Sequence, residues 1–174
     1  MALWYTEMKF WLVFLFVPLF LSAQAWGEED RLRVVVLDVK EGQSVLLVKK
    51  NKGLLLDTGH FGITEMVLDS MKSYGVKDLE HIILTHLHPD HASGIFNLMQ
   101  HFPEAIITES GFRSQENLKI DSMRWVAEAL DSGRWQMRKT RQGDSFHWQN
   151  CVIKILWPAS FAGGNSNSLS IVAD

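Results

Sequence analysis

Four potential metal ligands within six residues constrain this chain more than any other feature. They lie in the run Thr85-His86-Leu87-His88-Pro89-Asp90-His91, between an apolar stretch and a stretch with helical spacing. On extended backbone, His86 and His88 project to the same side, because side chains alternate with a period of two. Pro89 favours extended geometry at His88 and cannot continue a strand ladder, so a helix is expected to begin near Asp90. The run therefore predicts a strand, a short loop and a helix within a mixed α and β domain.

The same four side chains form a candidate metal site. Imidazole nitrogens and a carboxylate suit zinc, and also iron or manganese in a related geometry. The spacing suits two adjacent metals, one bound by His86 and His88 and the other by Asp90 and His91. A hydroxide between them would be a strong nucleophile, because metal binding lowers the pKa of water towards about 7. Asp90 is also expected to take or return a proton, which makes it a candidate catalytic residue.

A chance match to these four positions has a probability of roughly one in a thousand for this composition. The alternative is a solvated histidine-rich turn, or core histidines satisfied by backbone groups. The chain has other groups that resemble ligands, and each has an ordinary interpretation. His60, His101 and His147 are expected to be surface or partly buried histidines, Gly143-Asp144 a turn, and Asp174 a fraying end.

Outside the run, β-branched and leucine-rich stretches alternate with stretches of helical periodicity. Strands are expected at 32–38, 44–49, 54–57, 81–85, 104–108, 151–157 and 169–173. Turns at 40–43 and 51–53 make the first three strands an antiparallel meander. Helices are expected at 64–74 before Gly75, at 91–102, and from Asp121, as its cap, to Gly133. The tract 160–168, rich in Gly, Ala, Ser and Asn, is expected to be flexible.

The first 25 residues have the features of a secretory signal peptide. Phe10–Leu21 is an unbroken apolar run, preceded by Lys9 and followed by Ala23-Gln24-Ala25. A membrane-spanning helix needs roughly 20 apolar residues, so this run is short for one. Cleavage after Ala25 would release an exported domain of residues 26–174, periplasmic or secreted. The alternative is an uncleaved N-terminal membrane anchor.

The composition excludes some classes of protein. The net charge of −3 excludes a globally basic surface that grips nucleic acid by bulk electrostatics. A basic run, Arg138-Lys139-Thr140-Arg141 between Trp135 and Trp148, would contact a phosphate chain or, as we favour, form a solvated strand edge. The single Cys151 excludes an intrachain disulfide and a cysteine zinc cluster, and it is expected to be a small core residue.

The residues 85–91 resemble the metal motif of the metallo-β-lactamase superfamily. More narrowly, the chain from about Leu32 onward is similar to the extracytoplasmic hydrolase domain of ComEC-type DNA-uptake proteins and their stand-alone relatives. The resemblance rests on four segments in the same order as in that family. They are 37–44, similar to its "DVGQGD" opening, 55–59, the metal loop 83–94, and 155–158 followed by 165–169.

This resemblance implies an αββα sandwich with a dinuclear site, usually of zinc, along one edge. It implies that Asp57 lies near the metals and orients the site, and that Gly94 allows a helix to pack closely against the sheet. The narrower family favours a phosphodiester such as nucleic acid as substrate. The broader superfamily also includes hydrolases of β-lactams, lactones and thioesters, so a small-molecule substrate stays open.

Three departures from the family pattern bear on these expectations. The opening has Lys40 where the family usually has glycine, and Ser44 follows Gln43 where an aspartate is expected. The family's bridging Gly-Asp and its later histidine segment would fall beyond Asp174. On this basis the chain is expected to be the N-terminal half to two-thirds of a metallohydrolase.

Two hypotheses follow. In the first, the chain is an exported dizinc-type hydrolase, or the front part of one. In the second, it is a catalytically inactive or truncated exported protein of the same fold that acts by binding.

Overall fold

The computed structural model describes residues 30–158 and 170–173, and Arg33 onward forms one compact unit. The expected signal peptide, the whole Gly/Ser-rich tract 160–168 with the segment 165–169, and Asp174 lie outside the described residues. Within the part that is described, no helix has the length and apolarity needed to cross a bilayer.

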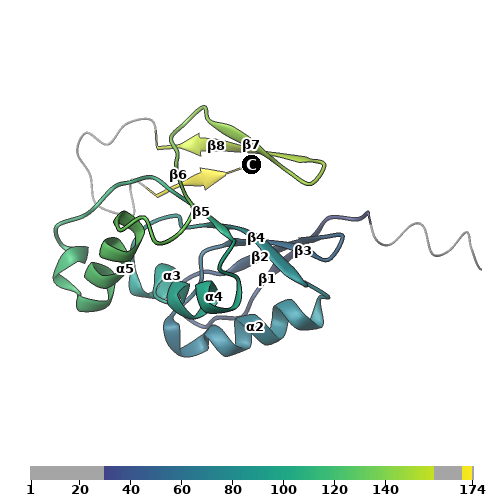
Figure 1. Ribbon diagram of the computed structural model, residues 1–174, viewed down its shortest axis with the longest axis horizontal. Coiled ribbons are helices and arrows are strands. Elements are labelled where there is room, and N and C mark those ends of the chain that lie inside the picture. Colours follow the sequence, from purple (N-terminus) through teal and green to yellow (C-terminus); the bar gives the residue numbers. More distant parts are fainter. Residues whose placement is uncertain (1–29, 159–169, 174) are drawn as a thin grey trace, which may run out of the picture. The chain divides into compact units, whose positions relative to one another are not determined.

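A six-stranded sheet forms the centre of this unit (Figure 1). Its strands, in spatial order, are β1 (Arg33–Val36), β2 (Val45–Lys49), β3 (Lys52–Leu56), β4 (Asp78–Ile83), β5 (Ile106–Glu109) and β6 (Met137–Lys139). The first three strands pair antiparallel, which confirms the expected meander. The next three pairings are parallel, so the carboxyl ends of β3, β4 and β5 meet at one edge of the sheet.

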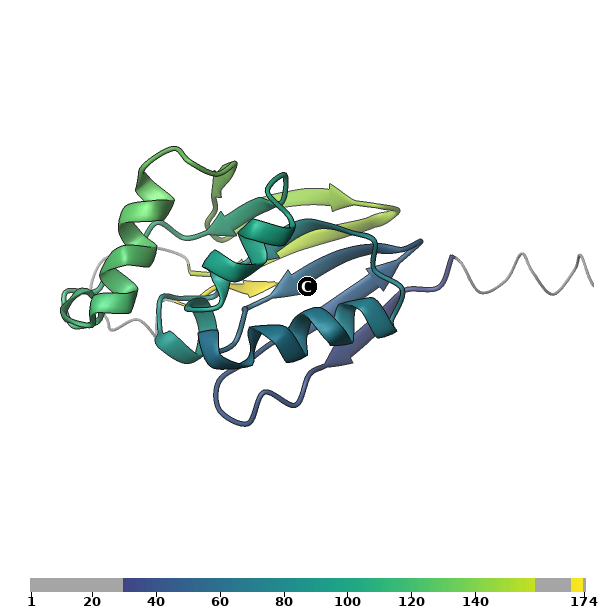
Figure 2. The same cartoon turned by 60° about the horizontal axis from the view of Figure 1, so that its bottom comes forward.

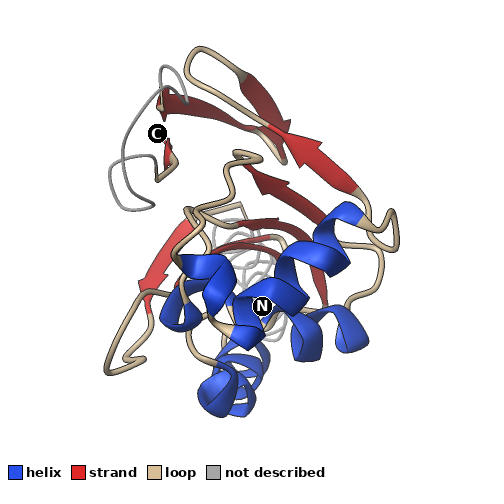
Figure 3. Ribbon diagram, turned by 90° about the vertical axis from the view of Figure 1, so that its left-hand side faces the viewer, coloured by secondary structure: helices blue, strands red, loops and turns tan. Residues whose placement is uncertain are grey.

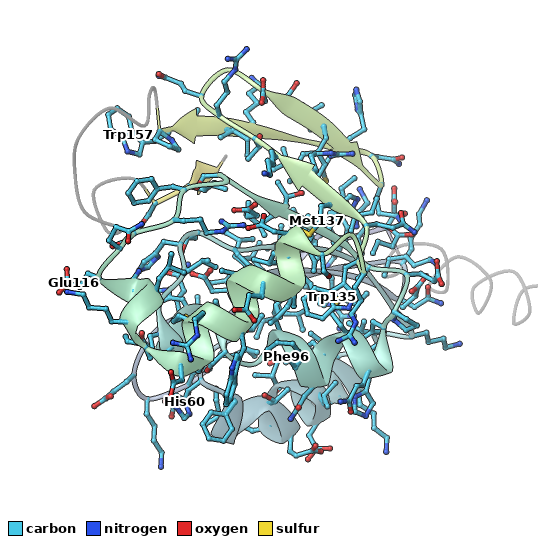
Figure 4. All side chains as sticks on the ribbon, turned by 60° about the vertical axis from the view of Figure 1, so that its left-hand side comes forward. His60, Phe96, Glu116, Trp135, Met137 and Trp157 are labelled. Carbon is cyan, nitrogen blue, oxygen red and sulfur yellow. The ribbon has the colours of Figure 1, made fainter. Side chains whose placement is uncertain are left out.

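A second sheet of three antiparallel strands lies over one face of the first. It consists of β7 (Ser145–Trp148), β8 (Cys151–Trp157) and β9 (Val172–Ala173). Both sheets contribute to one apolar cluster, made of Leu54, Ile83, Phe146, Trp148, Ile153, Ile155 and Ile171. On the outer side of β8, Val152 and Leu156 are 45% and 47% exposed, and Trp157 at the end of the strand has 41% of its surface accessible (Figure 4).

The helices cover the opposite face of the six-stranded sheet (Figure 2). They are α2 (Thr64–Ser73), α3 (Pro89–Ala92), α4 (Ile95–His101) and α5 (Asp121–Asp131), with short 3-10 turns η1 (Phe61–Ile63) and η2 (Asn117–Lys119). Their buried side chains form the larger core with the sheet, including Val67, Met71, Ile95, Leu98, Val126 and Leu130. Phe96 of α4 adds an edge-on contact with Trp135, with ring centroids 5.5 Å apart (Figure 4). The described chain thus has a helical layer followed by two sheets (Figure 3), as expected for the α/β sandwich class.

Several expected elements have different boundaries. The helix expected over 91–102 is two helices, because the amide of Gly94 donates to the Thr58 hydroxyl oxygen at 3.1 Å and not along the helix. The carboxylate of Asp121 pairs with Arg124 at 2.6 Å and makes no cap, so the prediction of a capping role was wrong. Neither β6 nor β7 is among the seven strands expected from apolar runs, since both are short and carry charged or polar residues. The basic run that β6 shares was expected only as a strand edge.

The basic run at 138–141 is partly withdrawn from solvent. The guanidinium carbon of Arg138 lies 4.6 Å from the centre of the Phe146 ring, between the two sheets. Trp148 is buried in the inter-sheet core, so it offers no exposed face to a base. Lys139 and Arg141 remain exposed. The strand-edge interpretation of this run therefore holds better than an interleaved phosphate-binding surface.

The turn between β1 and β2 shows the energetic cost of one departure from the family pattern, Lys40 in place of glycine. Lys40 adopts a φ of 64°, in the left-handed region that costs L residues with a Cβ roughly 1 kcal/mol or more. Glycine adopts this region without that cost, so a glycine is the better residue here.

We predict that Lys40→Gly raises the free energy of unfolding by about 0.5–1 kcal/mol. The measurement is urea unfolding of both proteins. Lys40→Ala is the matched control, because it removes the exposed charge but keeps the Cβ, and it should give no comparable gain. A gain of equal size in Lys40→Ala would assign the effect to charge and contradict the strain account.

His81 of β4, which lies between the two sheets, makes the stability of the fold depend on pH. The pKa of His81 is lowered by burial and by the charge of Arg138, and its ring lies 4.9 Å from that of Phe146. The unfolded chain takes up a proton at His81 below about pH 6.5, while the folded chain does not until lower pH. The contribution of His81 to the free energy of unfolding is therefore present above about pH 6.5 and is lost as the pH falls.

We predict that His81→Phe, which keeps a ring against Phe146, makes stability fall less between pH 7.5 and 5.5 than in the natural chain. Urea unfolding at both pH values gives the comparison. His101→Phe, a change at an exposed histidine, is the control and should leave the pH dependence unchanged. Equal losses in all three proteins would contradict this role for His81.

Candidate metal centre

The four predicted ligands lie directly after β4, at the carboxyl edge of the six-stranded sheet. The strand ends at Ile83, and α3 begins at Pro89. His88 is extended, with φ −116° and ψ 153°, as Pro89 predicts. The ring of His86 lies 4.5 Å from that of His88 and 4.3 Å from that of His91, measured between centroids. The expected strand, loop and helix are thus confirmed, and the three rings gather on one side of the loop.

The candidate metal-binding atoms lie close together in two pairs. His86 Nε2 lies 3.1 Å from His88 Nδ1, and His91 Nε2 lies 3.7 Å from Asp90 Oδ2. These are the two pairs that the spacing predicts. Within the residues that the structure describes, no three His, Cys, Asp or Glu side chains converge closely enough to enclose one ion.

A buried carboxylate, that of Asp57, lies beneath the loop. Asp57 immediately follows β3, has no exposed surface and adopts a φ of 55°. Its Oδ1 accepts a hydrogen bond from the Thr85 amide at 2.8 Å, and its Oδ2 accepts one from the Thr85 hydroxyl at 2.7 Å. His91 Nδ1 lies 2.7 Å from the same Oδ2. Asp57 therefore contacts both ends of the metal loop.

The charges of Asp57 and His91 act on each other. Burial raises the pKa of Asp57, although the hydrogen bonds from His91 and Thr85 act in the opposite direction. Burial lowers the pKa of His91, but the hydrogen bond and charge of Asp57, with the charge of Asp90, raise it overall. The hydrogen bond to Asp57 therefore favours a proton on His91 Nδ1.

Hydrogen bonds of the backbone and of the Thr58 and Ser93 side chains fasten the loop after β3 to the metal loop. The Thr58 amide donates to the His91 carbonyl at 2.7 Å, and the Thr58 hydroxyl donates to the same oxygen at 3.0 Å. The Phe61 amide donates to Ser93 Oγ at 2.9 Å. A Cβ at Gly94 would lie 3.0 Å from the Thr58 carbonyl oxygen. Gly94 thus allows a close approach to the loop after β3. The close packing of a helix against the sheet, which the resemblance implies, stays a prediction.

Two further residues hold the loop, and the sequence pattern did not identify either. Gly42 has a φ of 83°, and a Cβ there would lie only 2.0 Å from the Asp90 carbonyl oxygen. The buried Asn117 of η2 donates from Nδ2 to the Leu87 carbonyl at 2.6 Å. Gly42 belongs to a segment that resembled the family opening, which was the one available signal. Asn117 lies 30 residues from Leu87 and carries no motif.

The remaining candidates have the ordinary roles expected of them. His60 and His101 are exposed and bind neighbouring backbone, through Gly62 N and Asn97 O, and His147 is exposed on β7. Figure 4 shows His60 at the periphery of the fold. Gly143-Asp144 forms a turn, in which Asp144 Oδ2 accepts from the Arg141 amide at 3.0 Å. Cys151, expected to be a small core residue, is instead half-buried at the start of β8 and belongs to neither apolar cluster of the described residues.

Comparison with known families identifies the family of this chain. The family model of the Metallo-beta-lactamase superfamily matches residues 37–132. This range includes the loop after β3, the metal loop and α5. The chain belongs to the metallo-β-lactamase superfamily.

Among curated proteins, the chain is similar to Recombination protein 2 of Haemophilus influenzae and Competence protein ComA of Neisseria gonorrhoeae. It is 30% identical to the first over 150 residues, 82% of this chain and 17% of that protein. It is 31% identical to the second over 130 residues, 74% of this chain and 18% of that protein. The resemblance to competence proteins is confirmed at this level, while the chain spans less than a fifth of either relative.

Solved structures share the fold at low sequence identity. A metallo-β-lactamase of Cronobacter sakazakii has a TM-score of 0.52 at 17% identity, covering 76% of this chain and 51% of that one. A chemotaxis sensor, ODP, with a peroxy diiron species has a TM-score of 0.54 at 20% identity, covering 75% and 51%. The chain thus spans about half of each of these structures.

We predict that Gly42→Ala destabilises the protein by about 1–3 kcal/mol more than Gly75→Ala does. Both positions have similar positive φ values, 83° and 78°, so both variants bear the left-handed cost. Only Gly42 faces a backbone atom, since a Cβ at Gly75 has no heavy atom within 4 Å. Urea unfolding measures both costs. Equal costs would mean that the close contact with Asp90 has no energetic weight.

Proposed function

We propose that this chain contributes a metal-dependent hydrolase site, in which His86 and His88 bind one metal and Asp90 and His91 bind a second. The observation that carries the proposal is the arrangement of donor atoms in two pairs at one loop. Asp57 orients the site from below and does not itself bind metal. Zinc is the metal that we propose, with iron or manganese as the alternatives.

The residues fit such a metal by their donor atoms. Two nitrogens that bind one tetrahedral zinc at 2.0–2.1 Å lie about 3.3 Å from each other. The 3.1 Å between His86 Nε2 and His88 Nδ1 is close to this value. His91 directs Nδ1 towards Asp57 and so leaves Nε2 on the side of Asp90. An imidazole held by a carboxylate through its other nitrogen is a common arrangement for a metal-binding histidine.

A bound metal supplies a water of lowered pKa and a Lewis acid that stabilises a developing oxyanion. The chain's own residues supply the rest of the chemistry. Asp90, with 39% of its side chain exposed, can exchange a proton with the reacting water and with solvent. Asp57, with no exposed surface, holds its geometry and takes no part in proton exchange with solvent.

We propose a phosphodiester, such as nucleic acid, as the substrate, with small-molecule acyl substrates as the alternative. The support is the similarity to a recombination protein and a competence protein over most of the described chain. Export through a signal peptide at residues 1–25, or an N-terminal anchor there, remains part of this proposal. The similarity to a competence protein also supports a function in DNA uptake.

A second candidate function is binding without catalysis. It is favoured by the finding that no group of three potential ligands encloses an ion within residues 30–158 and 170–173. Under this alternative, the fold would bind one metal weakly or none.

We predict that the full chain, purified without chelator, carries one to two zinc equivalents measured by mass spectrometry of metals. His86→Ala/His88→Ala should lose at least one equivalent, because two donors of one ion are removed. His60→Ala/His101→Ala is the matched control, and it removes two exposed histidines outside the loop. Zinc content that is equal in the three proteins would contradict the proposed ligands.

We predict that the zinc-loaded chain hydrolyses bis(4-nitrophenyl) phosphate and that Asp90→Asn lowers kcat/KM by about 10²–10⁴. Asp69→Asn makes the same chemical change at an exposed site on α2 and should leave the rate unchanged. A chromogenic cephalosporin serves as the acyl substrate. Hydrolysis of the cephalosporin alone would reject the phosphodiester, and no hydrolysis of either would favour the binding function.

A further inference from the structure

The hydroxyl group of Thr85 lies between the buried carboxylate and the first histidine of the loop. Its oxygen is 2.7 Å from Asp57 Oδ2 and 3.0 Å from His86 Nδ1. Thr85 is 9% exposed, and Asp57 is fully buried. A chain of hydrogen bonds therefore runs from Asp57 through Thr85 to the ring of His86.

The number of protons available in this series of hydrogen bonds decides the tautomer of His86. A threonine hydroxyl has one proton to donate and two lone pairs with which to accept. The proton is donated to the carboxylate of Asp57, so only lone pairs face His86. His86 Nδ1 must then carry the proton of that contact, and the neutral ring has its lone pair on Nε2. This nitrogen lies 3.1 Å from His88 Nδ1, which is therefore the donor of that contact in the metal-free chain and loses this proton when it binds metal.

The same oxygen of Asp57 fixes a second ring. His91 Nδ1 lies 2.7 Å from Asp57 Oδ2, so this nitrogen is also a donor, and the neutral ring has its lone pair on Nε2. His86 and His91 belong to the two different donor pairs. One carboxylate oxygen therefore acts on both pairs, directly at one and through a hydroxyl group at the other.

We infer that Thr85 is a positioning residue that transmits the orientation set by Asp57 to His86, so that both His86 and His91 present Nε2 as the metal-binding atom. This inference rests on the proposed metal site for its function. Its structural content, the tautomer of His86, is independent of any bound metal. At His86, zinc binding in this tautomer needs no proton transfer within the ring, so loss of the Thr85 hydroxyl group should weaken the affinity.

Thr85→Val tests this inference with little other change. Valine has nearly the shape of threonine, with a methyl group in place of the hydroxyl group, so it removes the contacts of that hydroxyl group with Asp57 and His86. The backbone bonds of residue 85 do not depend on the side chain, since its amide donates to Asp57 Oδ1 and its carbonyl accepts from the Ile171 amide. Thr85→Ser restores the hydroxyl group and is the rescue variant.

The first measurement is the ring ¹⁵N spectrum of the metal-free full chain with labelled histidine, at a pH where the rings are neutral. We expect the Nδ1–H form of His86 in the natural chain and in Thr85→Ser, and a mixture of both tautomers in Thr85→Val. His101, whose Nδ1 contacts the Asn97 carbonyl, is the internal control and should not change. An Nε2–H form of His86 in the natural chain would overturn the inference without any variant.

The second measurement is the zinc dissociation constant. Thr85→Val should weaken zinc binding by about 10- to 100-fold, and Thr85→Ser should restore most of the affinity. Unchanged tautomer and affinity in Thr85→Val would overturn the inference while leaving the metal site intact. A His86 tautomer that depends on Thr85 in a chain that binds no zinc would instead support the inference and reject the proposed function.

Discussion

The carboxylate of Asp57 is the group on which the geometry of the loop depends. It is fully buried, and a buried charge is costly unless hydrogen bonds surround it. Here the donors are the amide and hydroxyl groups of Thr85 and the ring of His91, so the two ends of the metal loop satisfy the carboxylate. The loop is therefore fixed by the requirement to solvate one charge, and the rings of His86 and His91 lie together as a consequence.

The fold brings these partners together from distant parts of the sequence. The parallel pairing of β3 with β4 places Asp57 beside Thr85, 28 residues later, at the same edge of the sheet. The turn at Gly42 packs against the carbonyl of Asp90, and Asn117 supports the carbonyl of Leu87. The loop is thus held from three sides by segments that lack ligands of their own. Loops fastened in this way can keep ligands close to their binding geometry before a metal arrives.

The sequence predicts the local part of this arrangement well. The two-residue spacing of His86 and His88 and the restriction imposed by Pro89 are local effects, and both are confirmed. Contacts such as Gly42 with Asp90 join segments 48 residues apart, and local patterns do not show them. The helix break at Gly94 was missed for the same reason, because its amide binds Thr58. The ligand assignment and the role of Asp90 stay predictions.

The central claim is that this loop binds metal through His86 Nε2 and His88 Nδ1. Anomalous diffraction at the zinc edge, from crystals of the full chain grown with zinc, tests it directly. We predict a peak within about 2.0–2.1 Å of both nitrogens. A structure with zinc peaks elsewhere and none at this loop would contradict the claim.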